Sequence, residues 1–192
     1  MALSRTRVAT LLGVLLGASL TSTMVVRTTQ AVFTGNTSTS NTWSTGGAEI
    51  TSDGTGSAVF NAGADGALVN GQTLTKCIVV TYKGATVPAA VRLYSSAVAG
   101  TGLADYLNVT VDVGSSTSVG GNCAGWALSS TPFTGTLTDF AAKNSFANGV
   151  GSWGPSVVNE KLTYRFTVTV QNVPAAQNKT ASATFTWEAQ TP

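Results

Sequence analysis

The 192-residue sequence contains no histidine. A Ser-His-Asp triad, a Cys-His pair and an HExxH zinc helix all need that side chain, so these catalytic arrangements are excluded. Charged residues are also scarce, at 9% of the chain, and the eight acidic residues are scattered along it. We therefore predict that the protein is not an enzyme. A pair of carboxylates brought together by folding, as in glycoside hydrolysis, is the weaker alternative.

Cysteine is almost as rare, since only Cys77 and Cys123 are present. Two isolated cysteines without a CxxC motif do not make a zinc site, so we predict no metal and no cofactor. In an oxidising compartment the expected state is one disulfide between Cys77 and Cys123. Two free thiols are the alternative.

The longest apolar run lies at the N-terminus. Arg5 and Arg7 precede an apolar stretch over residues 8–26, and Thr29-Gln30-Ala31 then puts a small residue at the end of a cleavage site. This order is typical of a secretory signal peptide, with cleavage between Ala31 and Val32. A retained membrane anchor is the alternative, although serines and threonines dilute the stretch.

Removal of residues 1–31 leaves 161 residues, enough for one domain with a core of its own. Seven of the ten basic residues and all eight acidic residues lie after Ala31, so the mature net charge is −1. No cluster of basic residues remains to hold phosphates, and we predict no nucleic-acid partner. We expect membrane contact only through the signal peptide before cleavage.

Alternating apolar and polar residues mark several strands. The clearest runs are residues 162–171 and 181–188, which we expect to form an antiparallel pair. Further strands are expected over residues 76–82, 88–95 and 107–113, with short ones over 48–51 and 57–61. Residues 61–71, 114–121 and 144–156 are predicted loops, and residues 136–143 a short helix. The fold class is therefore all-β, an antiparallel β-sandwich of jelly-roll or immunoglobulin-like topology.

Four tryptophans offer one candidate binding feature, namely Trp43, Trp126, Trp153 and Trp187. Together they could form an aromatic face for carbohydrate. Packing is the favoured interpretation, above all for Trp187, which lies on the apolar face of its strand.

The order of short motifs along the chain is also informative. After a signal peptide that ends in TQA at 29–31 come VFT at 32–34, NTWSTG at 41–46, KCIVVTYKG at 76–84, AAVRLY at 89–94, LTYRFTV at 162–168 and ATFTWEA at 183–189. This order resembles the TasA/camelysin family, whose precursors are cut by a SipW-type signal peptidase, and it is most similar to the actinobacterial branch. The resemblance covers nearly the whole chain.

The resemblance implies a secreted jelly-roll-like sandwich at the cell surface, with some relatives forming biofilm-matrix fibres. In such fibres the freed N-terminal segment of one subunit adds as a strand to the next. The corresponding donor segment here is residues 32–43, which include Val32, Phe33 and Trp43. The protease activity described for camelysin is not transferred, because no histidine is present to bind zinc.

Two function hypotheses follow. The first is a subunit of an extracellular fibre, a head-to-tail homopolymer assembled by donor-strand exchange after a signal peptidase has acted. The alternative is a monomeric cell-surface binding or adhesion module, with carbohydrate as its candidate ligand.

Overall fold

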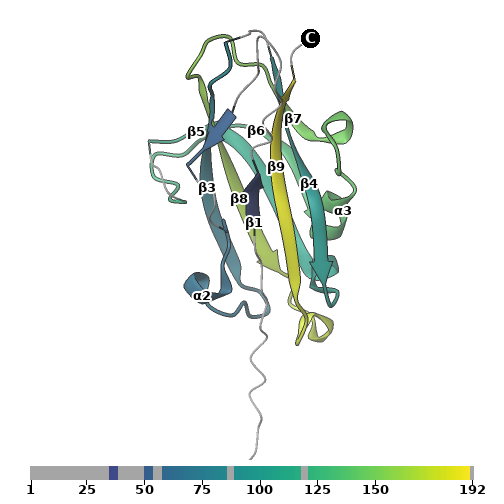
Figure 1. Cartoon of the computed structure of the whole chain (residues 1–192). Helices are drawn as coiled ribbons and strands as arrows, with labels where there is room; N and C mark the ends of the chain where they lie inside the picture. The colour runs from purple at the N-terminus through teal and green to yellow at the C-terminus, as the bar shows by residue number, and fades with distance from the viewer. Residues whose placement is uncertain (1–34, 39–49, 54–57, 86–88, 118–120, 191–192) are drawn as a thin grey trace, which may run out of the picture.

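The computed structural model describes residues 35–38, 50–53, 58–85, 89–117 and 121–190. These residues form nine strands, two short α-helices and three 3-10 turns (Figure 1). In chain order they are β1 (Gly35–Ser38), β2 (Ile50–Ser52), α2 (Ala62–Asp65), β3 (Thr73–Tyr82), β4 (Ala90–Gly100), η1 (Leu103–Tyr106), β5 (Leu107–Ser115), β6 (Ala127–Thr136), α3 (Leu137–Ala141), η2 (Phe146–Asn148), β7 (Val150–Trp153), β8 (Lys161–Val170), η3 (Pro174–Ala176) and β9 (Ala181–Gln190).

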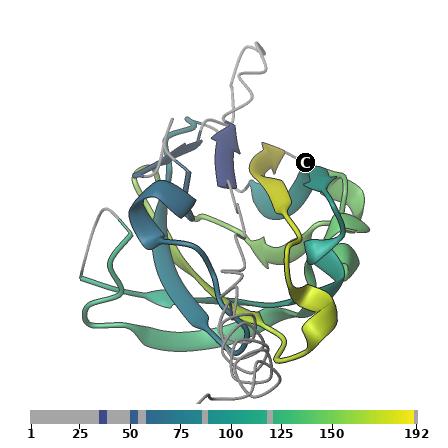
Figure 2. The same ribbon diagram turned by 90° about the horizontal axis from the view of Figure 1, so that it is seen from below.

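The strands divide into two sheets. One sheet has the order β2-β3-β8-β5-β6, and the other has the order β1-β9-β4-β7. Figure 2 shows the two sheets as facing layers in the view from below. Because the apolar side chains of both inner faces meet between the layers, the predicted all-β sandwich is confirmed.

The predicted pairing of the last two strands is wrong. β8 lies between β3 and β5, whereas β9 lies between β1 and β4 in the other sheet. Alternation reports that one face of a strand is buried, but it does not report which strand lies beside it. β8 and β9 face each other across the core, where the rings of Phe166 and Phe185 have centroids 4.8 Å apart.

Aromatic side chains fill the centre of this core. The Phe166 ring also meets Trp187, and Trp187 packs edge-on against Tyr164 with centroids 5.5 Å apart. Phe185 continues the cluster to Phe140 of α3. Edge-to-face contacts of this kind stabilise a core beyond the area they bury. The side chains of β8 and β9 therefore join the two sheets.

The short helix is confirmed near its predicted place. α3 begins after Thr136, whose hydroxyl accepts from the Asp139 backbone N–H while the Asp139 carboxylate accepts from the Thr136 backbone N–H. This capping box holds the first turn, and the bonds from Thr136 lower the pKa of Asp139. Leu137 and Phe140 are buried against the sheets.

Other predictions of local structure need correction. Residues 58–61 are not a strand but a bend that leads into α2, within the segment predicted as a loop. β7 lies inside the predicted loop 144–156, and β6 was not predicted. Five of the ten β6 residues are exposed in a row, so the strand has little of the apolar alternation on which the prediction depends.

Tyr164 makes the stability of this core depend on pH. Burial raises the pKa of its phenol, and its hydroxyl has no hydrogen-bond partner among the described residues. Tyrosine in the unfolded chain ionises near pH ~10, so the unfolded state gains stability above that pH at up to about 1.4 kcal/mol per pH unit while folded Tyr164 stays neutral. We predict that Tyr164→Phe leaves the free energy of unfolding near neutral pH within about 1 kcal/mol of the parent value. We also expect a shallower loss of stability in alkali, measured by urea unfolding across that range.

The control is urea unfolding of the parent and of Tyr164→Phe near neutral pH, where their free energies of unfolding should agree within about 1 kcal/mol. The free energy of unfolding of Tyr164→Phe should still fall somewhat as the pH rises in alkali, because burial also raises the pKa of Tyr82 and Tyr94. If the free energy of unfolding falls equally steeply with pH in Tyr164→Phe and in the parent, Tyr164 is not the source of the alkaline loss of stability.

Candidate functional site

The outer edge of β9 is where the N-terminal segment meets the domain. β1 pairs with β9 in parallel, from Gly35 opposite Ala183 to Ser38 opposite Thr186. Every other strand pair among the described residues is antiparallel. Figures 1 and 2 show β1 as a separate short strand beside β9.

β1 covers only part of that edge. On its other side, β9 is paired with β4 from Gln190 to Ala181. On the β1 side, strand pairing is limited to residues 183–186, so residues 187–190 have no strand partner there among the described residues. Among the described residues, the edge of β9 is therefore longer than the strand that pairs with it.

The predicted donor segment, residues 32–43, coincides with this strand only in part. Its residues 35–38 form β1. Val32, Phe33 and Trp43 lie outside the described residues, as do the predicted signal peptide and its cleavage site between Ala31 and Val32. The structure thus places the middle of the segment on the chain's own β9.

The two cysteines form the predicted disulfide. Cys77 of β3 and Cys123 are joined, with their Cα atoms 5.2 Å apart. The Cys77 backbone N–H also donates to the carbonyl of Gly121, which adds a backbone bridge beside the covalent one. Together they attach the segment between β5 and β6 to the outer face of the five-stranded sheet.

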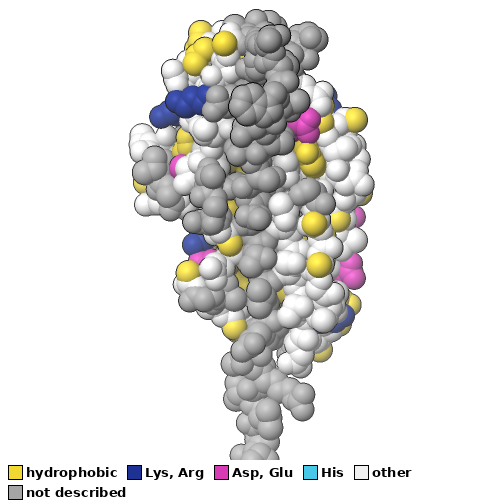
Figure 3. Space-filling view, in the orientation of Figure 1, with side chains coloured by type: hydrophobic (Ala, Val, Ile, Leu, Met, Phe, Trp, Pro, Cys, Tyr) yellow, Lys and Arg dark blue, Asp and Glu magenta, His cyan; other side chains and the backbone are white. Residues whose placement is uncertain are grey.

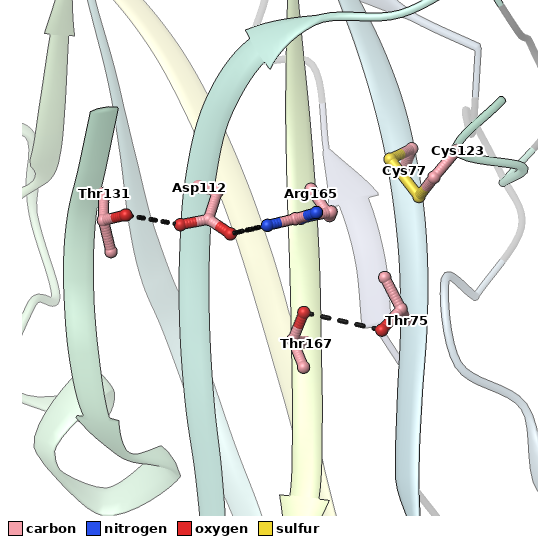
Figure 4. A network of polar contacts seen from close by, with 7 residues as sticks. All are labelled: Thr75, Cys77, Asp112, Cys123, Thr131, Arg165 and Thr167. Atoms are coloured by element: carbon pink, nitrogen blue, oxygen red, sulfur yellow. Dashed lines mark hydrogen bonds and ion pairs between the residues drawn. A yellow bond between two sulfur atoms is a disulfide. The ribbon is translucent and has the colours of Figure 1, made fainter. Parts of the chain in front are cut away.

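A charged pair lies beside this attachment and was not predicted. Asp112 of β5 accepts two bonds from Arg165 of β8, at 2.6 and 3.1 Å, and a third from the Thr131 hydroxyl of β6 (Figure 4). The Arg165 guanidinium lies over the Trp126 ring, 4.7 Å from its centroid. Asp112 and Arg165 lie opposite each other on neighbouring strands. Their ion pair could therefore be predicted from the sequence only if the strand order were known.

The hydrogen bonds of the Asp112 carboxylate are made within this cluster. Asp112 is 4% exposed, and the charge-assisted bonds from Arg165 and the hydroxyl bond from Thr131 occupy its oxygens. Its geometry positions three strands and the loop above them. We find no acceptor or nucleophile in it that is left for a substrate.

The described tryptophans do not form an exposed face. Trp187 is buried in the core, and Trp126 is half-buried against Arg165. The half-buried Trp153 donates its indole N–H to Glu160, whose pKa is lowered by the bond from the Ser156 backbone and then by this one. Each of the three is thus held by contacts within the domain.

The described carboxylates are likewise engaged locally and on different elements. Asp105 accepts from the Thr138 hydroxyl, Asp65 pairs with Lys76 at 2.6 Å, and Glu188 accepts from the Tyr94 hydroxyl. Burial first and the bond to Glu188 second raise the pKa of Tyr94. No group of three or more metal-ligating side chains occurs in the part of the chain that the structure describes.

The surface carries little charge. On the face shown in Figure 3, the described lysines, arginines and acids are few among uncharged side chains. Within the described ranges, no helix has the length and apolarity needed to cross a membrane.

Comparison with protein-family models finds no match, and comparison with curated proteins finds no relative. The TasA/camelysin resemblance therefore stays an expectation from the sequence motifs. The edge of β9 with β1 on it is the candidate site that the structure itself supplies.

The disulfide generates a stability prediction. It closes a loop with a sequence separation of 46, and the chain-entropy model gives a contribution of about 4 kcal/mol for a loop of this length. We expect the double variant Cys77→Ala/Cys123→Ala to lose a free energy of unfolding of that order in urea titrations.

Reduction of the parent with a thiol reagent is the matched control and should lower its stability by a similar amount. Unchanged stability in both experiments would show that the loop is held by its non-covalent contacts alone.

Proposed function

We propose that the chain, once its signal peptide is removed, is a subunit of an extracellular fibre that assembles by donor-strand exchange. The observation that carries the proposal is β1. It is a four-residue parallel strand at the edge of the four-stranded sheet, and it belongs to the N-terminal segment that signal cleavage would free.

β1 is well suited to exchange on energetic grounds. Parallel pairs are slightly less stable per residue than antiparallel ones, and four residues offer few backbone bonds. The same segment from a second copy would make the same pairs with β9, so replacing one by the other conserves the contacts. The cost of exchange is then mainly the entropy of association.

The segment between β1 and β2 is also long enough for β1 to pair with a neighbouring copy. Eleven residues, 39–49, separate β1 from β2 in the sequence. Fully extended, a segment of that length spans at most about 40 Å, which is comparable to the size of a small domain. β1 of one copy could therefore pair with β9 of its neighbour while its own domain stays folded.

Such a contact is head-to-tail, because each subunit gives β1 and receives another at β9. Head-to-tail contacts that do not close into rings produce open filaments. The partner is thus another copy of the chain, with a signal peptidase acting during export. The product would be secreted and held in a matrix or on the cell surface.

The alternative function, a monomeric carbohydrate-binding module, has less support. It needs exposed aromatic side chains, and none of the three described tryptophans is exposed. The proposal also needs no cofactor, no nucleic acid and no catalysis.

The first test compares a chain that begins at Val32 with the same chain carrying several extra residues before Val32. We expect large oligomers or filaments from the first and monomers from the second, measured by size-exclusion chromatography with light scattering and by electron microscopy. Monomers from both would overturn the proposal.

A competition experiment identifies the strand. A synthetic peptide with the sequence of residues 32–43 should occupy β9 and shorten the filaments when added in excess. A scrambled peptide of the same composition is the matched control and should leave their length unchanged. Equal effects of the two peptides would show that the filament contact lies elsewhere.

A further inference from the structure

The outer face of the five-stranded sheet carries a regular pattern of threonines. Four neighbouring strands, β3, β8, β5 and β6, each present a pair of outward side chains that are two residues apart, which places both on the same face. All members of these pairs are threonines except for one asparagine. The pairs are Thr73 and Thr75, Thr167 and Thr169, Asn108 and Thr110, and Thr134 and Thr136. We call these side chains the threonine grid.

The strand register arranges the grid in two rows. One row runs through Thr73, Thr169, Asn108 and Thr136, and the other through Thr75, Thr167, Thr110 and Thr134. The two register shifts between β5 and β6 come after Val111, so they lie outside both rows. Neighbouring strands are ~4.8 Å apart and the two rows are ~6.8 Å apart, which gives the grid two fixed repeats.

The grid ends where the segment between β5 and β6 is attached to the sheet. The next outward residue of β3 is Cys77, which holds that segment through its disulfide. The next outward residue of β8 is Arg165, which lies under the Trp126 ring. Figure 4 shows Thr75 and Thr167 beside this attachment. The attached segment therefore covers the face on one side of the grid only.

The grid keeps hydrogen-bonding capacity for a ligand. The hydroxyls of Thr110 and Thr134 have no hydrogen-bond partner among the described residues. Between β3 and β8 the hydroxyls pair across the strands, at 2.8 Å in one row and 3.5 Å in the other, and each such pair still has a donor and acceptors to offer. Thr136 is committed to Asp139, and the Asn108 amide oxygen accepts from Gln171.

We propose that the threonine grid binds a single chain of a neutral, linear polysaccharide, which crosses the strands between the two rows. The distance between neighbouring strands is close to the length of one sugar residue in such a chain. Successive sugars can therefore meet successive strands, with one polar side chain on each side of the chain. Sugar hydroxyls both donate and accept hydrogen bonds, as threonine hydroxyls do. Four strands are enough for about three or four sugar residues.

The grid fits other classes of ligand less well. Phosphates and acidic sugars need a cation, and the nearby Arg165 is already bonded to Asp112. A protein partner is usually held by aromatic or arginine anchors, and the grid contains neither. Neighbouring strands also turn by about 20° relative to one another, so the grid is not flat. A single flexible chain can follow this twist, whereas the face of a crystal cannot.

The binding of one domain should be weak and independent of the fibre. The grid uses hydrogen bonds rather than stacking on tryptophan, and water competes for each of them. It also lies on a different sheet from β9, which pairs with β1. If the proposed fibre forms, many grids along it bind one polysaccharide together and the affinity rises. If the fibre does not form, the weak binding of the single domain remains to be measured.

The test uses the chain with extra residues before Val32, so that the domain is measured without polymerisation. Native electrophoresis is run through gels that contain hydroxyethyl cellulose, glucomannan or a soluble β-glucan, beside a reference protein that binds none of them. We expect at least one of the three to slow the domain relative to the reference. Unchanged migration in all three gels overturns the inference.

The double variant Thr110→Val/Thr134→Val tests the location. It removes two hydroxyls that have no partner within the described domain, so its stability in urea should match that of the parent. We expect its association constant, obtained from migration against polysaccharide concentration, to be about tenfold lower, because two hydrogen bonds to the chain are lost. Equal binding by the variant and the parent overturns the assignment to the grid.

Thr81→Val is the matched control. Thr81 is an outward threonine of β3 that lies beyond Cys77, about 20 Å from Thr75, so its substitution should leave the association constant unchanged. Weakening by Thr81→Val as large as that of the double variant places the contact elsewhere. Retardation by alginate, a charged chain, in place of the neutral ones overturns the class of ligand. Binding to crystalline cellulose without retardation by any soluble chain does the same.

Discussion

The contact between the inner faces of β8 and β9 is the constraint on which the rest of the molecule depends. These two strands carry the aromatic side chains that join the sheets, with Phe166 on Phe185 and Trp187 on Tyr164. Once they are fixed, β3 and β5 take the two sides of β8, and β4 takes one side of β9. On the other side of β9, β1 is the strand partner among the described residues. The candidate site at the edge of β9 therefore follows from the division of the strands into a five-stranded and a four-stranded sheet.

Many of the strands could be predicted from the sequence, because the alternation of apolar and polar residues indicates which side chains are buried. Residues 162–171 alternate between apolar and polar side chains, and the strand there is confirmed with its apolar residues inside. The disulfide followed from the count of cysteines and is also confirmed. What alternation cannot give is the neighbour of each strand, so the pairing of β8 with β9 was wrong. β6 was missed for the related reason that only Phe133 among its residues has a buried side chain.

The candidate site shows the same limit. Residues 32–43 were singled out because the resemblance to the TasA/camelysin family implies a donor segment there, and that resemblance implies a partner strand without saying which one. The parallel direction of β1 and its place on β9 required the structure. The Asp112–Arg165 pair was hidden for the same reason, since the two residues are 53 positions apart and meet only because β5 lies beside β8. Long-range pairing is set by the whole fold rather than by any local pattern.

The parallel direction of β1 gives the molecule a polarity. Gly35 pairs with Ala183 near the start of β9, and Gln190 is the last residue of that strand. The start of β1 and the end of β9 are therefore 190 − 183 = 7 strand residues apart, roughly 23 Å. A passenger domain fused after the last strand would therefore project from the end of the sandwich opposite to the entry of β1. If the proposed filament forms, cargo fused there would be displayed at a regular spacing and away from the strand that joins one unit to the next.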